Sequence, residues 1–134
     1  AWQAKADGIY AHHEHPGEVE EGFRGWGRAI TDFETGIWAI DTVKPGPVAG
    51  RDGRMMAPHL NLWIVARGIN IGLSTRLYFP DEAEANAADP VLGMIEGDTR
   101  RETLIANRAE SEGQPLYRFD IRLQGDGETV FFDI

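Results

Sequence analysis

Sixteen glycines and seven prolines are spread along the whole 134-residue chain, and this spacing constrains the fold more than any other feature of the sequence. Both residues interrupt long helices, whereas tight turns between strands require them. With 42% hydrophobic residues the chain can bury one modest core. We therefore predict an all-β fold, a β-sandwich of short strands with one or two small helices, in which residues 1–134 form a single domain.

Alternating side chains and turn residues place the expected elements. Because His59–Val65 is largely apolar on both faces, we predict a central strand there, with another at Leu73–Phe79. Two hairpins are expected, one joining 28–32 to 37–43 and one joining 116–123 to 129–132. A short helix should run from Pro80 to about Ala88, and a second helix or irregular segment should cover 100–108. The core is expected to hold Trp26, Trp38, Trp63, Phe131 and Phe132.

The charge and the absence of cysteine exclude several classes of function. A formal net charge of −9 argues against binding to nucleic acid or to an anionic membrane, since both require basic surfaces. Without cysteine there can be neither a disulfide nor a thiolate metal site, which is compatible with the cytoplasmic location that we expect. The chain opens at Ala1 in strand-like sequence with no initiator methionine, so we expect an N-terminal portion of the domain to precede it.

Three groups of residues invite a functional reading, and each has a plainer alternative. The run from His12 to His15 is rich in metal-binding side chains, but adjacent residues point apart, so a solvated loop is favoured over a metal site. His59 and Asn61 have the spacing of a His-x-His metal pair, yet an amide is a poor ligand, which favours an internally hydrogen-bonded histidine. Arg67 could bind a carboxylate, or could form an ordinary surface ion pair.

Several ordered segments resemble the intradiol ring-cleavage dioxygenases, and the resemblance spans nearly the whole chain. They are Trp2–Ala4, Asp7–Tyr10, Thr42–Pro47, Pro58–Asn61, Arg67–Gly68, Leu77–Phe79 and Tyr117–Ile121. Within that family, residues 66–71 and 123–132 look like the alpha subunit of an enzyme built from alpha and beta subunits. The resemblance implies the family's fold and the cleavage of an aromatic diol by O2 to a cis,cis-muconate.

Members of that family hold ferric iron with two tyrosinates and two histidines, in Gly-x-Tyr, Pro-Gly-Pro-Tyr and His-x-His motifs. Carried over to this chain, Tyr10 and His59 match the first tyrosine and the first histidine. Val48 stands at the second tyrosine, Asn61 at the second histidine, and Met56 where catalytic chains carry an arginine. Two of four ligands are thus lost, and even the loss of groups behind the ligands costs roughly 10 to 100-fold in affinity. We expect this chain to bind no metal and to have no catalytic residue of its own.

The resemblance further implies that Fe(III) is bound by a partner beta subunit in an alpha–beta oligomer. Arg67 would then bind the substrate's carboxylate at the interface, a task that suits its forked guanidinium. Two alternatives stay open. The chain could be a self-sufficient intradiol dioxygenase with an altered iron site, or a non-enzymatic β-sandwich binding module.

Overall fold

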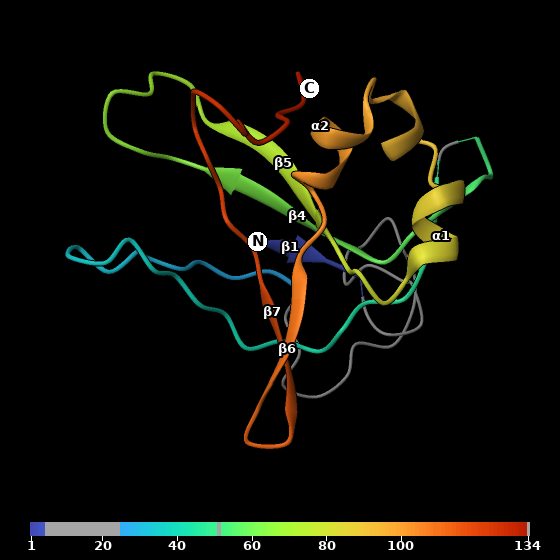
Figure 1. The fold of residues 1–134 in the computed structure, drawn as a ribbon, viewed down its shortest axis with the longest axis horizontal. Coiled ribbons are helices and arrows are strands. Elements are labelled where there is room, and N and C mark those ends of the chain that lie inside the picture. Colours follow the sequence, from blue (N-terminus) through green and yellow to red (C-terminus); the bar gives the residue numbers. More distant parts are fainter. Residues whose placement is uncertain (5–24, 51, 134) are drawn as a thin grey trace.

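The computed structural model describes residues 1–4, 25–50 and 52–133. The described part consists mostly of short strands with two short α-helices, as expected (Figure 1). The strands are β1 (Trp2–Gln3), β2 (Val48–Ala49), β3 (Met55–Met56), β4 (His59–Ile64), β5 (Leu73–Tyr78), β6 (Asn107–Ser111) and β7 (Gln114–Arg118). The helices are α1 (Ala83–Ala88), the 3-10 helix η1 (Leu92–Met94) and α2 (Asp98–Glu102). No helix of the described part is long and apolar enough to cross a membrane.

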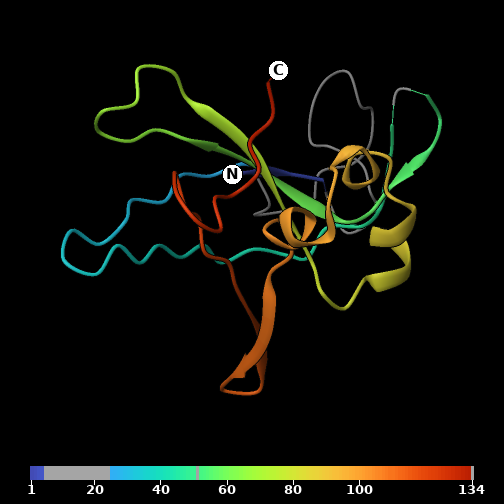
Figure 2. The same ribbon diagram turned by 45° about the horizontal axis from the view of Figure 1, so that its top comes forward.

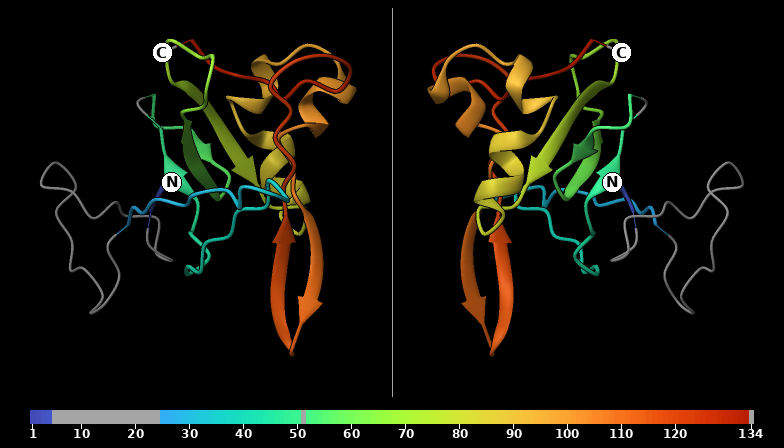
Figure 3. Two further views of the ribbon diagram at one scale, coloured as in Figure 1. Left: turned by 90° about the vertical axis from the view of Figure 1, so that its left-hand side faces the viewer. Right: turned by 90° about the vertical axis from the view of Figure 1, so that its right-hand side faces the viewer.

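The largest sheet is antiparallel and has the order β1-β4-β5. The central position predicted for His59–Val65 is confirmed, because β4 pairs with a strand on each side. A second, two-stranded sheet joins β2 to β3, and a third joins β6 to β7. The β6–β7 hairpin projects away from the rest of the molecule in Figures 1, 2 and 3.

The β4–β5 pair buries apolar side chains on one face along its length and on the other face at the Tyr78 end. Leu60, Leu62 and Leu77 face one way and pack with Phe79, Ala106 and Phe119. On the other face Tyr78 packs with Ala57, Leu92, Ile95, Leu104 and Val130, which come from the helical region and the C-terminal segment.

Helix α1 confirms the prediction of a short helix over 80–88, and its ends are held by polar side chains. The Asn86 amide donates to the carbonyl oxygen of Phe79 at 2.8 Å, which fixes the helix against the end of β5. Asp89 follows the helix, and its carboxylate accepts from the backbone N–H groups of Val91 and Leu92, at 2.9 Å each. Asp89 therefore ends α1 and begins η1.

The hairpin predicted at 28–32 and 37–43 is wrong in its strands and correct in its turn. The turn is closed by Gly36 N donating to Asp32 O, with Gly36 at φ +71°, and the Asp32 carboxylate accepts from the N–H groups of Glu34 and Thr35. These hydrogen bonds lower the pKa of Asp32. No strand forms in this arm, since Ile30 and Phe33 are fully exposed and a two-stranded ribbon without a core to pack on is only marginally stable.

The second predicted hairpin is also corrected. Residues 114–118 pair with β6 rather than with residues 129–132, and only the first two residues of β6 overlap the segment 100–108 where we expected a helix or irregular chain. The cause is the two-residue turn at Glu112 and Gly113, whose φ angles of 53° and 78° are those of a tight hairpin turn. The expected reversal near 124–128 does occur, because Thr129 N donates to Arg122 O at 2.9 Å, but Phe132 then bridges Ser74 of β5.

The expected core is also corrected for two tryptophans. Trp26 and Trp63 are 61% and 69% exposed, whereas Trp38, Phe131 and Phe132 are partly buried. Trp63 is the second-last residue of β4, at the end of the strand that is open to solvent. The alternation of residues along a strand does not show which of its ends will be exposed.

Candidate functional site

The β4–β5 register gathers two of the positions that the resemblance assigns to iron ligands on one face of the sheet. His59 lies opposite Tyr78 and Asn61 lies opposite Arg76. Because residues two apart on a strand share a face, and directly paired residues do too, all four side chains are on the same side. Asn61 also pairs with Trp2 of β1. The spacing predicted from His59-x-Asn61 is therefore realised on a regular strand.

His59 is buried in this face, as the plainer reading of a lone strand histidine predicted. Its Nδ1 lies 2.8 Å from the carbonyl oxygen of Ala57, and since a carbonyl only accepts, Nδ1 carries the proton. Its ring stands 5.7 Å from the ring of Tyr78. Burial, and then the charge of Arg76, lower the pKa of His59 to about 4. The imidazole is thus neutral at neutral pH.

Val48 lies in an apolar cluster beside this face. It pairs with Met56 across the β2–β3 sheet, and both contact the fully buried Ala4. The position that the resemblance assigns to a tyrosinate therefore carries a buried aliphatic side chain, which offers no atom to a metal. Met56 is half-buried, at the position where the resemblance places an arginine.

Arg76 joins the apolar cluster to the strand face. Its Nη1 lies 3.5 Å from the Met56 sulfur and donates to the Tyr78 hydroxyl at 3.3 Å. The Tyr78 hydroxyl in turn donates to Asp89 at 3.1 Å, and burial raises the pKa of Tyr78 well above its usual range. Sequence reasoning missed Arg76, because only the cross-strand register shows that it faces Asn61.

The other residues predicted for this region lie outside the described part of the chain. Tyr10 and the run from His12 to His15 fall within residues 5–24, so their predictions are untested. Among residues 1–4, 25–50 and 52–133, no three histidine, aspartate or glutamate side chains come together in a way that could hold a metal ion.

Arg67 is presented to solvent at the end of the β4–β5 hairpin. A turn closed by Ile69 N donating to Ala66 O at 3.2 Å places Gly68 at φ +79°, which favours glycine, and leaves the Arg67 side chain exposed. Within the described residues Arg67 has no ion pair or hydrogen bond from its side chain. The surface ion pair that was its plainer reading is therefore not formed within the described part.

Exposed apolar residues flank Arg67 in the sequence of the same hairpin. Trp63, Val65 and Ile71 are all exposed, and the hairpin end projects from the body of the molecule in Figure 1. Singly scattered apolar side chains are normal on a protein surface, and these three lie on β4 and on the connection to β5. The structure places Arg67 apart from the described ligand positions, at the opposite end of β4 from His59.

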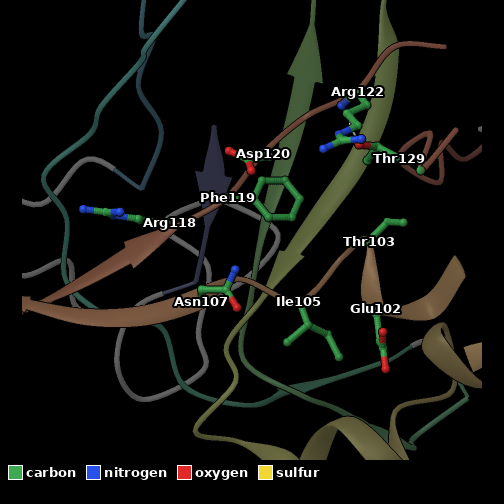
Figure 4. Close-up of a pocket in the computed structure, with 10 residues that line it drawn as sticks. Glu102, Thr103, Ile105, Asn107, Arg118, Phe119, Asp120, Arg122 and Thr129 are labelled. Atoms are coloured by element: carbon green, nitrogen blue, oxygen red, sulfur yellow. Dashed lines mark hydrogen bonds between the residues drawn. The ribbon is translucent and has the colours of Figure 1, made fainter. Parts of the chain in front are cut away.

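A polar cleft of about 170 Å³ lies elsewhere, between α2, β6 and the C-terminal segment (Figure 4). Its polar groups already serve the fold, since Arg122 N donates to the Thr129 hydroxyl at 2.9 Å and Val130 N donates to the Thr103 hydroxyl. Val48, His59 and Asn61 do not line it. We assign this cleft a structural role.

Comparison with known proteins gives a consistent set of matches. The family model described as dioxygenase matches residues 1–125. The protocatechuate 3,4-dioxygenase alpha chain of Pseudomonas putida is 56% identical over 132 residues, which cover 98% of this chain and 64% of that relative. The alpha chain of the same name from Burkholderia cepacia is 46% identical over 118 residues, covering 87% of this chain and 57% of that relative. The chain thus spans somewhat less than two thirds of the length of these relatives.

Proposed function

The chain belongs to the dioxygenase family, and from that membership we propose that it is the non-iron-binding alpha subunit of a protocatechuate 3,4-dioxygenase. Such an enzyme cleaves 3,4-dihydroxybenzoate with O2 to 3-carboxy-cis,cis-muconate, and both oxygen atoms enter the product. The observation that carries the proposal is the pair of altered ligand positions. Val48 is buried among apolar side chains, and Asn61 faces a guanidinium rather than a second histidine.

These residues do not fit a ferric ion. An aliphatic side chain and an amide replace two ligands that would supply charge and lone pairs. We therefore assign Fe(III) to a partner beta subunit within an alpha–beta oligomer. We also propose that residues 1–134 form one domain with a β-sandwich fold. The match of the dioxygenase family model over residues 1–125 supports this.

We assign Arg67 the task of binding the carboxylate of the aromatic diol at the subunit interface. Three features support this role: the side chain is exposed, it is free of partners within the described residues, and it stands among exposed apolar side chains. A guanidinium at an interface can hold a carboxylate with two parallel hydrogen bonds. The chain would thus contribute orientation and charge, while the redox chemistry takes place on the partner.

The proposal is tested by iron analysis of the native protein together with any chain that co-purifies. We expect one iron per alpha–beta pair, the visible colour of ferric tyrosinate, and turnover of 3,4-dihydroxybenzoate. Iron bound to this chain alone would instead establish a self-sufficient dioxygenase. If no iron-bearing chain co-purifies, the chain is a binding module without enzymatic activity.

Arg67→Ala tests the proposed residue in the assembled enzyme. A hydrogen bond to a charged group contributes about 1.5 to 3 kcal/mol, so kcat/KM should fall roughly 10 to 100-fold, mainly through a higher KM. The matched control is Arg100→Ala, which removes another exposed arginine, on α2, and should leave kcat/KM unchanged. Equal kinetics for wild type and Arg67→Ala would remove Arg67 from the substrate site.

A further inference from the structure

The connection between β4 and β5, residues 65–72, carries Arg67 and projects from the body of the molecule (Figure 1). Regular strand pairing ends at Ile64 and Leu73. Past this pair the turn at the tip is closed by Ile69 N donating to Ala66 O at 3.2 Å. An irregular connection has many accessible conformations, so side-chain contacts where it leaves the strands decide how well its tip is placed.

One such contact joins Trp63 of β4 to Gly72, the last residue of the connection. Trp63 pairs with Ser74, so Gly72, two residues before Ser74, is its diagonal neighbour on the same face of the sheet. A Cβ on Gly72 would overlap the indole, meeting its Nε1, Cε2 and Cζ2 atoms. The ring therefore lies directly against the backbone of Gly72.

This contact, and not the backbone conformation, explains the glycine at position 72. The φ angle of Gly72 lies outside the left-handed region that favours glycine, whereas that of Gly68 at the tip is +79°. A glycine next to a strand lacks a side chain to pack, and an aromatic ring from the neighbouring strand can take its place. Trp63 is 69% exposed, so its contact with Gly72 acts on the connection rather than on the core.

We propose that Trp63 positions Arg67 for the substrate carboxylate by packing on Gly72 and fixing the connection where it enters β5. The inference rests on the proposed function, which assigns the carboxylate to Arg67. Trp63 acts through the connection and without touching the substrate. It reduces the number of conformations that the connection samples before binding, and such pre-organisation raises affinity because less entropy is lost on binding.

The test measures the affinity of the alpha–beta assembly for two diols in the absence of O2, so that each diol binds without being cleaved. One is 3,4-dihydroxybenzoate, and the other is catechol, which has no carboxylate. The change in ferric-tyrosinate absorbance reports binding of both. A cross-strand aromatic contact has a modest free energy, so Trp63→Ala should weaken binding of 3,4-dihydroxybenzoate about two- to fivefold and leave that of catechol unchanged.

Two results of this titration would overturn the inference. Equal weakening of both diols would mean that Trp63 maintains the structure in general, and unchanged binding of both would mean that it does not position Arg67. Trp63→Phe keeps a flat ring over Gly72 and should retain most of the affinity for 3,4-dihydroxybenzoate. The matched control Met94→Ala removes another exposed apolar side chain, on η1, and should leave both affinities unchanged.

A double-mutant cycle with Arg67 separates positioning from an independent contribution. In the Arg67→Ala background, Trp63→Ala should cause no further loss of affinity for 3,4-dihydroxybenzoate, because no guanidinium is left to position. A further two- to fivefold loss in that background would overturn the inference. Arg67→Ala alone tests the proposed function: wild-type affinity in that variant removes Arg67 from the substrate site, whereas weaker binding with no effect of Trp63→Ala refutes only the role of Trp63.

Discussion

Asp89→Ala should destabilise this protein more than any exposed acidic substitution, because its carboxylate holds three parts of the fold together. One oxygen accepts from Ala57 N at 2.8 Å, just before β4. The other accepts from the Tyr78 hydroxyl at 3.1 Å and from the N–H groups of Val91 and Leu92 at 2.9 Å each. Asp89 itself is only 2% exposed.

The magnitude follows from the donors that would be left without an acceptor. Ala57, Tyr78 and Leu92 are all fully buried, so water cannot replace the carboxylate at these three donors. A buried donor without a partner costs about 1 to 3 kcal/mol, and removal of the buried charge offsets part of the sum. We expect Asp89→Ala to cost about 3 kcal/mol, a large part of the roughly 5 to 15 kcal/mol that stabilises a typical domain.

Amide hydrogen exchange of the assembled protein measures this cost locally. Protection of the β4 and β5 amides should fall about 100-fold in Asp89→Ala, the equivalent of about 3 kcal/mol. In Asp89→Asn, amide protection should lie between that of wild type and that of Asp89→Ala. The amide oxygen can still accept from three donors, but the NH2 group stands against Ala57 N, which also donates. The control Asp98→Ala removes an exposed carboxylate that pairs with Arg101 and should cost well under 1 kcal/mol. If Asp89→Ala lowers protection no more than Asp98→Ala, the reasoning is refuted.

Two further predictions concern His59 and the hairpin that carries Arg67. The pKa of His59 is lowered to about 4 by burial and by the charge of Arg76 on β5, against the opposing charge of Asp89. Because its unfolded pKa is 6.5, the unfolded chain takes up the proton first, and the stability of the fold falls as the pH falls from 6.5 to 4. The loss of stability over this range is about 3 kcal/mol. In urea unfolding, the difference in free energy of unfolding between wild type and His59→Gln should therefore shrink by about 3 kcal/mol from pH 6.5 to pH 4. A difference that does not change with pH would contradict this prediction. Gly72→Ala would drive a Cβ into the Trp63 indole, so KM should rise through a displaced Arg67 loop, whereas Gly93→Ala, which meets no atom within 4 Å, should leave KM unchanged. Equal KM values for both glycine variants would show that Trp63 does not position the loop.

Local sequence signals were sufficient where one short-range cause dominates. The central strand at His59–Val65 follows from a short, largely apolar run on both faces, and β4 confirms it, as β5 confirms the strand at Leu73–Phe79. The helix over 80–88 follows from alanine-rich sequence ended by Pro90, and α1 confirms it. The turn at Gly36 was likewise readable, because its backbone conformation favours glycine.

Local signals failed where the choice of partner decides the outcome. Residues 114–118 have a strand pattern, but that pattern does not show whether they pair upstream or downstream, and the positive φ of Glu112 is uncommon for a residue other than glycine. Trp63 has the side chain of a core residue, yet it extends past the covered part of the sheet. Burial depends on what packs against a residue, which no local pattern records.

The candidate site divides in the same way. The sequence by itself determined which residues stand at the positions that the resemblance assigns to iron ligands, since identity and spacing are local properties, and it singled out Arg67 as a candidate for binding a carboxylate. Only the tertiary structure decided that Arg76, fifteen positions beyond Asn61, faces it and touches Met56. The physical reason is that cross-strand register brings distant residues within a few ångströms, so the charge at a site is set by the fold and not by the motif.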